Sequence, residues 1–346
     1  MLENYGVLVV DDSALMRKTI SDIINASPNM TVIGRARNGL DAIEKIKRLQ
    51  PSIVTLDVEM PELDGLETLK YLMAEADRFV PVFMITNDEQ TSIEAMQLGA
   101  ADYILKSQLL EQQDYTLEDF YKRMNVAIKL KPVRKKAEKK KAAKETKKEP
   151  VKQKKCNKEL IVIGSSTGGP AALQKIITQF SSALPIPILI VQHMPPGFTK
   201  PLADRLNSLC EINVKEAEQN EILEAGTVYI APAGIQTTLE KDQSGHYIVK
   251  QKSDAKIQTL YKPSIDVALL SISEIAKEKM ITIILTGMGD DGLRGCRAVK
   301  KYGGTVIAES EETCVIYGMP KVVYEAGLAD RQLPLSSIYE EIISNL

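Results

Sequence analysis

The chain has 346 residues, which is enough for two compact domains of ordinary size. Hydrophobic residues make up 44% of it and charged residues 26%, and the sequence holds no uncharged apolar run of about 18 residues that could span a bilayer. The N-terminus is acidic where a signal peptide would be basic, so we expect a cytoplasmic protein with no direct membrane insertion. Its four cysteines are widely spaced and form no Cys-x-x-Cys or Cys/His pair, which argues against a zinc or redox site.

The formal net charge of −2 hides a strongly basic segment in the middle of the chain. Residues 131–155 hold 13 Lys or Arg against 3 Glu, with few apolar residues among them. Such a segment cannot bury enough surface to offset the entropy lost on ordering. We therefore predict a first domain at residues 1–130, a flexible Lys-rich linker at 131–157 and a second domain at 158–346. Nucleic acid or anionic lipid could bind the lysines, but aromatic residues for base stacking are absent and a solvated spacer is favoured.

Short β-rich runs alternate with amphipathic helical stretches in the first domain. Apolar residues recur at helical spacing between the runs, as at Met16, Ile20 and Ile23. Five βα repeats of this kind predict a five-stranded parallel sheet with helices on both faces, which is the doubly wound, flavodoxin-like arrangement. The expected strands are residues 7–10, 31–35, 53–56, 82–85 and 102–105.

Polar residues follow the strands of this domain at the points where the strands end. Asp11 and Asp12 follow the first strand, and Asp57 follows the third. Since the carboxyl ends of parallel strands share one edge, three carboxylates gather there, and their oxygen atoms suit Mg²⁺. Thr86 and Lys106 end the fourth and fifth strands. Any one of the five would be interpreted as a solvated turn residue, but together they are the parts needed to accept a phosphoryl group on Asp57.

The first domain resembles the response-regulator receiver family, through the motifs VVDDS, LDVEMPELDG, MIT and DYILK. The resemblance implies that a histidine kinase phosphorylates Asp57. It also implies a Mg²⁺ ion held by Asp12, Asp57 and the main-chain carbonyl of Glu59, with Asp11 in support.

The same resemblance gives roles to three further residues. Thr86 and Lys106 would bind the phosphoryl oxygens, and Tyr103 occupies the family's aromatic switch position. Lys106 is followed by Ser107 where the family usually has proline, which leaves open the geometry of that loop and any cis peptide bond in it.

The α/β pattern resumes at Glu159 and predicts a second doubly wound, mostly parallel α/β domain. Short strands are expected near Val214 and Val228, and a polar hairpin is expected around Gly245. The longer expected strands are residues 159–164, 187–193, 281–287 and 304–310, and the expected helices are 198–209, 264–278 and two that begin near 169 and 292.

Three strands of this domain lead to residues that could act together in acyl transfer. The first runs into GSSTGGP, residues 164–170, where a hydroxyl stands at a glycine-flanked turn before a helix, although such a loop could also bind an anion. The second strand ends in His193, and the third leads to Asp290 and Asp291. Serine, histidine and aspartate at one sheet edge are the set that attacks an ester, moves the proton and orients the imidazole. The spacing alone does not separate the two aspartates.

Five segments of the second domain look like the successive blocks of the chemotaxis methylesterase catalytic domain. They are residues 164–170, 192–195, 262–267, 286–292 and 317–320. The resemblance implies hydrolysis of glutamyl methyl esters on chemoreceptors with release of methanol, and often deamidation of receptor glutamines, with no cofactor in the esterase site. Carried over position by position, the nucleophile is Ser166, the base is His193 and the orienting acid is Asp291. The main-chain N–H groups of Thr167 and Met288 are the candidate oxyanion donors.

Two departures from the methylesterase pattern are visible. Ser165 stands where the family usually has alanine or threonine, so it remains an alternative to Ser166, and Tyr317 stands where the family usually has phenylalanine. A receiver joined to an inactive adaptor is disfavoured because no triad member is missing, whereas an esterase or amidase with another substrate stays open. A nucleic-acid-binding output is disfavoured because the second domain is acidic. We expect the receiver to inhibit the esterase until Asp57 is phosphorylated, since a tethered domain is highly concentrated near its neighbour's cleft.

Overall fold

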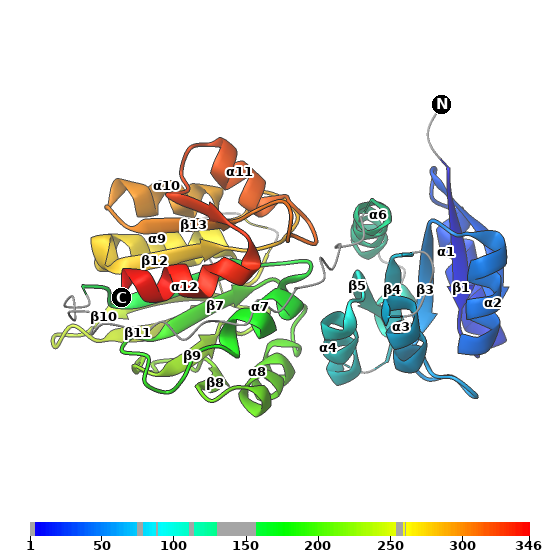
Figure 1. The fold of residues 1–346 in the computed structure, drawn as a ribbon, viewed down its shortest axis with the longest axis horizontal. Coiled ribbons are helices and arrows are strands. Elements are labelled where there is room, and N and C mark those ends of the chain that lie inside the picture. The colour runs from blue at the N-terminus through cyan, green and yellow to red at the C-terminus, as the bar shows by residue number, and fades with distance from the viewer. Residues whose placement is uncertain are drawn as a thin grey trace, which may run out of the picture.

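The structure is a computed structural model that describes residues 4–74, 79–87, 89–110, 114–129, 157–253, 259 and 261–346. The predicted Lys-rich linker falls outside these residues except for Asn157. Two α/β units lie side by side in Figure 1, the N-terminal one in blue and cyan and the C-terminal one in green to red. Within the described ranges, no helix is long and apolar enough to cross a membrane.

The N-terminal unit is a parallel sheet covered by helices on both faces. Its strands are β1 (Tyr5–Val10), β2 (Met30–Ala36), β3 (Ile53–Asp57), β4 (Val82–Thr86) and β5 (Asp102–Leu105). Its helices are α1 (Ala14–Asn25), α2 (Gly39–Leu49), α3 (Gly65–Ala74), α4 (Glu89–Leu98), α5 (Lys106–Leu110) and α6 (Asp114–Ile128). The strand order is β2-β1-β3-β4-β5 with every pair parallel, which confirms the predicted receiver fold.

Alternation along the strands divides the apolar side chains of this unit between two layers. Val7 and Val9 of β1 join a cluster with residues of α1 and α6, and Leu8 and Val10 join one with residues of α2, α3 and α4. Successive side chains of a strand point to opposite faces, so each strand supplies both layers. The sheet is therefore buried on both faces, as a parallel sheet requires.

The C-terminal unit is a second, larger parallel sheet with a separate hairpin. Its strands are β6 (Leu160–Ser165), β7 (Ile188–Gln192), β8 (Asn213–Glu216), β9 (Thr227–Ile230), β10 (Gln236–Lys241), β11 (Tyr247–Lys252), β12 (Met280–Ile284), β13 (Thr305–Glu309) and β14 (Arg331–Leu333). Its helices are α7 (Gly169–Ile177), α8 (Thr199–Leu209), α9 (Ile265–Ala276), α10 (Leu293–Lys301), α11 (Met319–Glu325) and α12 (Leu335–Asn345), with a 3₁₀ turn at Lys277–Lys279. The parallel order is β14-β13-β12-β6-β7-β9-β8, and β10 and β11 form an antiparallel pair.

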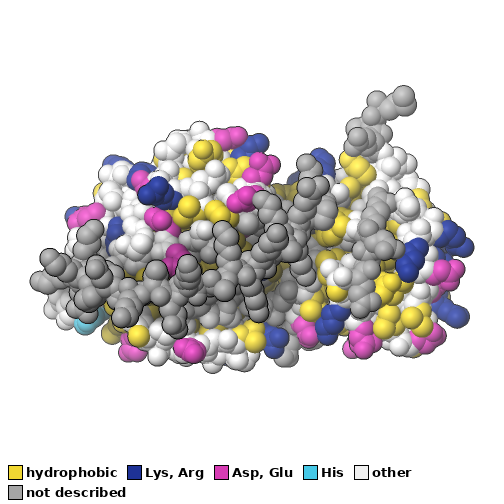
Figure 2. Space-filling view, in the orientation of Figure 1, with side chains coloured by type: hydrophobic (Ala, Val, Ile, Leu, Met, Phe, Trp, Pro, Cys, Tyr) yellow, Lys and Arg dark blue, Asp and Glu magenta, His cyan; other side chains and the backbone are white. Residues whose placement is uncertain are grey.

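Helices cover both faces of the seven-stranded sheet as well. α9, α10 and α11 pack on one face, and α7, α8 and α12 pack on the other. This confirms the predicted doubly wound, mostly parallel α/β domain. The strands β12, β6 and β7 are neighbours, so the three loops singled out in the sequence leave the sheet side by side. On the described surface in Figure 2, acidic and basic side chains are interspersed over both units.

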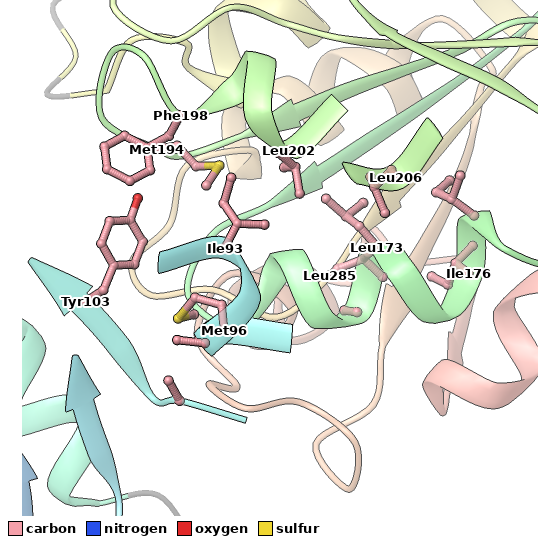
Figure 3. Packing of buried hydrophobic residues seen from close by; sticks show 14 of the residues in the cluster. Ile93, Met96, Tyr103, Leu173, Ile176, Met194, Phe198, Leu202, Leu206 and Leu285 are labelled. Carbon is pink, nitrogen blue, oxygen red and sulfur yellow. The ribbon is translucent and has the colours of Figure 1, made fainter. Parts of the chain in front are cut away.

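The two units share a layer of apolar side chains. Helix α4 of the N-terminal unit contacts α7 and α8 of the C-terminal unit. Ile93, Met96 and Tyr103 lie in one buried cluster with residues of both helices, as Figure 3 shows. The ring of Tyr103 packs on Phe198, with 5.0 Å between ring centroids and 31° between ring planes. Aromatic pairs at this separation contribute beyond the area that they bury.

The hairpin β10–β11 is held to the sheet by a charged cluster around Glu159. Its carboxylate accepts hydrogen bonds from Lys241 and from the Tyr247 hydroxyl, each at 3.0 Å, and from Lys279. Partial burial raises the pKa of Glu159, but these donors outweigh it and lower the pKa to about 2. A carboxyl whose pKa is lower in the folded state than in the unfolded chain stabilises the fold above the unfolded pKa. That contribution is lost as the pH falls toward the folded pKa.

We expect Glu159→Gln to lower the midpoint of thermal unfolding at pH 7 by about 1 to 4 °C, because the ion pairs lose their charge. The difference from the wild type should shrink as the pH falls from 6 toward 3, since Glu159 is then increasingly protonated in the unfolded wild-type chain. Scanning calorimetry at several pH values measures it. A difference that stays constant over this range would show that the charge of Glu159 is not what stabilises the hairpin.

Candidate functional site

The acidic residues predicted at the edge of the N-terminal sheet lie together. Asp11, Asp12 and Asp57 each have a carboxylate oxygen within 4.8 Å of the others. The ammonium of Lys106 lies 2.7 Å from Asp57 Oδ2 and 3.1 Å from Asp11 Oδ2. The second oxygen of Asp57 accepts a hydrogen bond of 2.8 Å from the main chain of Val58.

The electrostatics of this cluster favour the arrival of a cation. Burial raises the pKa of Asp57 to about 6, the charge of Asp11 adds to the increase, and Lys106 only partly offsets both. Three carboxylate oxygens in this arrangement fit a hard divalent cation such as Mg²⁺.

The remaining predicted residues of this unit lie around Asp57. Thr86 is buried at the end of β4, where its neighbour Ile85 pairs with Asp57. Tyr103 lies on the next strand, and the side chain of Glu59 is exposed after β3. The helix α5 begins at Lys106, and the cis peptide bond of the described chain is Lys262–Pro263 rather than the one before Ser107.

In the C-terminal unit, the strand β6 leads into the serine-containing turn. Gly168 precedes the first turn of α7 with a φ of 80°, and a side chain there would lie 2.5 Å from Val315. Only glycine adopts this conformation without strain and leaves room for the neighbouring loop. The turn therefore places Ser166 between the end of β6 and the N-terminus of α7.

The two adjacent serines have different environments. Ser165 is fully buried, and its hydroxyl donates a hydrogen bond of 2.6 Å to Gln192 Oε1. Ser166 lines a cavity together with His193. Of the two, Ser166 is thus the hydroxyl that a substrate can reach.

His193 and Asp291 are hydrogen-bonded to each other, as expected for a base and the acid that orients it. His193 Nε2 lies 2.7 Å from Asp291 Oδ2, and the other ring nitrogen, Nδ1, is buried with no hydrogen-bond partner among the described residues. A proton from Ser166 would therefore go to Nδ1. The ring of Tyr261 stacks on the imidazole at 4.0 Å and 5° between planes, which fixes the plane in which the imidazole lies.

Asp291 is buried but surrounded by donors. Besides His193, it accepts hydrogen bonds from the Ser264 hydroxyl and from the main-chain N–H groups of Ile265 and Asp266, at 2.7 to 2.9 Å. Burial raises the pKa of Asp291, but His193 and these N–H groups at the start of α9 outweigh it, so that the pKa is lowered. A carboxylate of this kind stays ionised and orients the imidazole rather than taking its proton.

Thr286 ties together the loops that carry the candidate oxyanion donors. Its hydroxyl donates a hydrogen bond of 3.0 Å to the carbonyl of Thr167 and accepts one of 2.8 Å from the N–H of Ile316. Its own N–H donates to the buried carboxylate of Glu309 at 2.8 Å, and its carbonyl accepts from Ser166 N–H at 3.0 Å. Thr167 and Met288 both line the cavity. Their main-chain N–H groups remain the candidate oxyanion donors.

The cavity has a volume of about 510 Å³ and is walled by both units. The esterase side supplies Ser166, Thr167, His193, Tyr261 and Met288, and the N-terminal unit supplies Met96, Asp102, Tyr103, Gln108 and Arg123. The sequence led us to expect the receiver near the esterase cleft, but the participation of Tyr261, Met96, Asp102, Gln108 and Arg123 was not predicted. Tyr261 directly precedes the 262–267 block, which was its only signal.

Comparisons with known proteins match both units of the chain to known families. The CheB methylesterase family matches residues 161–342, and the response regulator receiver domain family matches residues 7–114. The protein-glutamate methylesterase/protein-glutamine glutaminase of Halalkalibacterium halodurans is 44% identical over 99% of this chain and 99% of its own length. The protein of that name from Thermotoga maritima is 44% identical over 97% of each chain.

A solved structure is also similar to the C-terminal unit. The catalytic domain of Thermotoga maritima CheB methylesterase is 49% identical, with a TM-score of 0.53, and the match covers 55% of this chain and 99% of that domain. The fold and the site thus define a response regulator whose output unit is an ester hydrolase. This chain belongs to the CheB methylesterase family of chemotaxis.

We expect a fluorophosphonate, which phosphonylates activated serines, to label Ser166 and no other serine in the native protein. Ser166→Ala should abolish the labelling, whereas Ser165→Ala should keep at least a third of the labelling rate, because the buried Ser165 hydroxyl is engaged by Gln192. Mass spectrometry of the labelled peptide measures this, with a thermal melt as the folding control. Labelling that persists in Ser166→Ala and is lost in Ser165→Ala would reverse the assignment.

Proposed function

We propose that this chain hydrolyses glutamyl methyl esters on methyl-accepting chemotaxis receptors and releases methanol. The observation that carries the proposal is the cavity that Ser166 and His193 line together, with the imidazole hydrogen-bonded to the buried carboxylate of Asp291. The names of the similar proteins support the choice of substrate. They also support deamidation of glutamine, which requires the same acyl chemistry with ammonia as the leaving group.

In the proposed mechanism, Ser166 Oγ attacks the ester carbonyl while His193 Nδ1 takes the hydroxyl proton. Asp291 stabilises the imidazolium that forms, and the N–H groups of Thr167 and Met288 donate to the oxyanion. The tetrahedral intermediate expels the methoxy group, which receives the proton from His193 and leaves as methanol. Water then attacks the acyl-serine while His193 takes a proton from it. The bond between the acyl carbon and Ser166 Oγ breaks, His193 returns the proton to Oγ, and the receptor is released with a glutamyl carboxylate.

The receiver unit is proposed to accept a phosphoryl group on Asp57 from the chemotaxis histidine kinase. Asp11, Asp12, Asp57 and the carbonyl of Glu59 would hold Mg²⁺, which neutralises charge on the phosphoryl oxygens when it is bound. Lys106 already contacts Asp57 and would bind a phosphoryl oxygen there, as would the hydroxyl of Thr86.

We further propose the division into residues 1–130, 131–157 and 158–346, with the receiver inhibiting the esterase. The inhibition is supported by the cavity itself, because Tyr103 and its neighbours stand across from Ser166 and His193. A volume of about 510 Å³ admits a small molecule, whereas a receptor helix is about 10 Å wide with its side chains. The receptor could reach Ser166 only after the receiver has moved away.

The two sites are connected through neighbouring strands of the receiver sheet. Asp57 ends β3, Thr86 ends β4, and Tyr103 lies on β5 beside β4. A phosphoryl group on Asp57 would attract the Thr86 hydroxyl and free space beside β5 into which Tyr103 can turn. Because the Tyr103 ring packs on Phe198, its inward movement would remove an aromatic contact between the units.

The proposed activity is tested with receptor fragments carrying methyl-labelled glutamyl esters, in the presence of a small phosphodonor. We expect release of labelled methanol by the wild type, and a loss of about 10⁴-fold in kcat for Asp291→Asn. The matched control Asp290→Asn should remain within about threefold of the wild type, because the neighbouring Asp290 side chain is exposed to solvent. Absence of methanol release by the folded wild type would exclude the proposed substrate.

Control by the receiver is tested by comparing the unphosphorylated full chain, Asp57→Asn and residues 157–346 alone, each with and without phosphodonor. We call the form in which the receiver covers Ser166 the closed form, and the form in which it has moved away the open form. We expect phosphorylation to activate the full chain about ten to a hundredfold, which corresponds to a shift of about 1.4 to 2.8 kcal/mol in the equilibrium between these two forms. The isolated catalytic unit should be faster than the unphosphorylated chain, and Asp57→Asn should not respond.

A substitution in the shared apolar layer provides a matched pair on the full chain. Met96→Lys places a charge between the units and should raise unphosphorylated activity, whereas Leu110→Lys, at an exposed position of the same unit, should leave it unchanged. If the isolated catalytic unit and Met96→Lys were both no faster than the unphosphorylated chain, inhibition by occlusion would be excluded.

A further inference from the structure

The amide of Gln192 connects the two residues proposed as nucleophile and base. Its Nε2 donates one hydrogen bond of 3.0 Å to the carbonyl of Ser166 and one of 2.9 Å to the carbonyl of His193. Its Oε1 accepts the hydrogen bond of 2.6 Å from the Ser165 hydroxyl. Both amide hydrogens and the amide oxygen are therefore used, and all three contacts go to residues at the ends of β6 and β7.

The environment of Gln192 allows one orientation of the amide. The side chain is 1% exposed, so no water competes for its hydrogen bonds. A reversed amide would place an oxygen against two carbonyl oxygens and leave buried donors unpaired, which is costly. The ends of the two strands are also joined directly by the N–H of His193, which donates to the carbonyl of Ser165 at 3.0 Å.

Gly169 provides the space that the amide occupies. A Cβ atom on Gly169 would lie 2.0 Å from Gln192 Oε1 and 2.9 Å from Gln192 Cδ. The absence of a side chain at the first residue of α7 thus lets the amide reach the nucleophile's turn. The N–H of Gly169 donates to the same Ser166 carbonyl at 2.7 Å, so this carbonyl is held from two sides.

We propose that Gln192 is a positioning residue that fixes the backbone of Ser166 relative to the backbone of His193. Since each carbonyl is bound to a different hydrogen of one planar amide, the two cannot shift independently. Proton transfer from Ser166 to His193 needs this separation to be held closely, and a displacement of about 1 Å can cost a hundredfold in rate. The inference rests on the proposed roles of Ser166 and His193.

The test uses the full chain with Gln192→Met, which keeps the length of the side chain but donates no hydrogen bond. We expect the rate of Ser166 labelling by a fluorophosphonate and kcat on the methylated receptor fragment to fall about ten to a hundredfold, with KM within about threefold. Gln179→Met, at an exposed position after α7, is the matched control and should change neither quantity. Thermal melts are recorded for both variants, because a loss that only reflects unfolding would follow the melting temperature.

A second variant changes a residue that contacts the amide and leaves Gln192 itself in place. Its result does not depend on whether Gln192→Met folds. Gly169→Ala should displace the Gln192 side chain and reduce Ser166 labelling by a similar factor. The double variant should be no slower than the slower single variant, since both changes remove the same interaction. The role of Gln192 would be overturned if the losses in the double variant were fully additive, if kcat of the single variants were unchanged, or if only KM changed. Labelling of Ser166 in the wild type would still support Ser166 as the nucleophile in each of these cases. A wild type in which Ser166 is not labelled would overturn the proposed function and this inference with it.

Discussion

The backbone hydrogen bonds between parallel strands are the interaction on which both sites depend. They bring the carboxyl ends of neighbouring strands to one edge, where residues far apart in the chain become neighbours. In the receiver, this places Asp57 beside residues that follow β1 and β5, and in the esterase it places His193 beside residues that follow β6 and β12. The sheet interiors contain almost only apolar side chains, so the polar groups gather at the edges, where water or a ligand can reach them.

Asp57 and Asp291, which are two of the buried carboxylates, illustrate how the surroundings at such an edge give the same group different chemistry. Burial acts to raise the pKa of each, but the pKa of Asp57 is raised overall whereas hydrogen-bond donors lower the pKa of Asp291. Asp291 lies at the N-terminus of α9 and accepts several hydrogen bonds, so its charge is stabilised, which suits the proposed role of orienting the imidazole of His193. Asp57 faces a second carboxylate, and its charge is only partly offset by Lys106. A carboxylate whose negative charge is only partly compensated favours the binding of a cation and reaction with a phosphoryl group. A carboxylate whose charge is compensated by several hydrogen bonds is suited to holding a neighbouring side chain in place.

Much of the fold could be predicted because the central strands are buried along their whole length. The strands β3, β4, β6, β7 and β12 consist of buried residues throughout. In the sequence they are short apolar runs that are easily distinguished from the amphipathic stretches between them. The strand β14 was not predicted, since its three residues, RQL, are half-exposed or exposed and show no period. The helices α11 and α12 follow the last strand that we predicted and were likewise missed.

The sequence indicated which residues form the candidate site, but it did not indicate which side chains contact one another there. Motifs indicated Ser166, His193 and Asp291, yet the partner of Ser165 and the ring that stacks on His193 come from segments whose approach only the fold determines. The contact between the units could not be predicted either, because it also depends on segments that only the fold brings together. Ile93 and Met96 fit the apolar stripe of a helix packed within one domain, so the sequence pattern contains no sign that they also cover the neighbouring unit.

Under the proposed control by the receiver, the cavity shared by the two units would couple ligand binding to the state of the receiver. A small molecule that fills it and contacts both walls binds the closed form more tightly than the open one. If phosphorylation opens the two units as proposed, thermodynamic reciprocity requires that it weaken the binding of that molecule by the same factor by which the molecule disfavours the phosphorylated state. An inhibitor of this kind would differ from an ordinary competitor of the substrate. Its potency would be greatest in cells whose receptors are least stimulating the kinase, and it would oppose phosphorylation as well as ester hydrolysis.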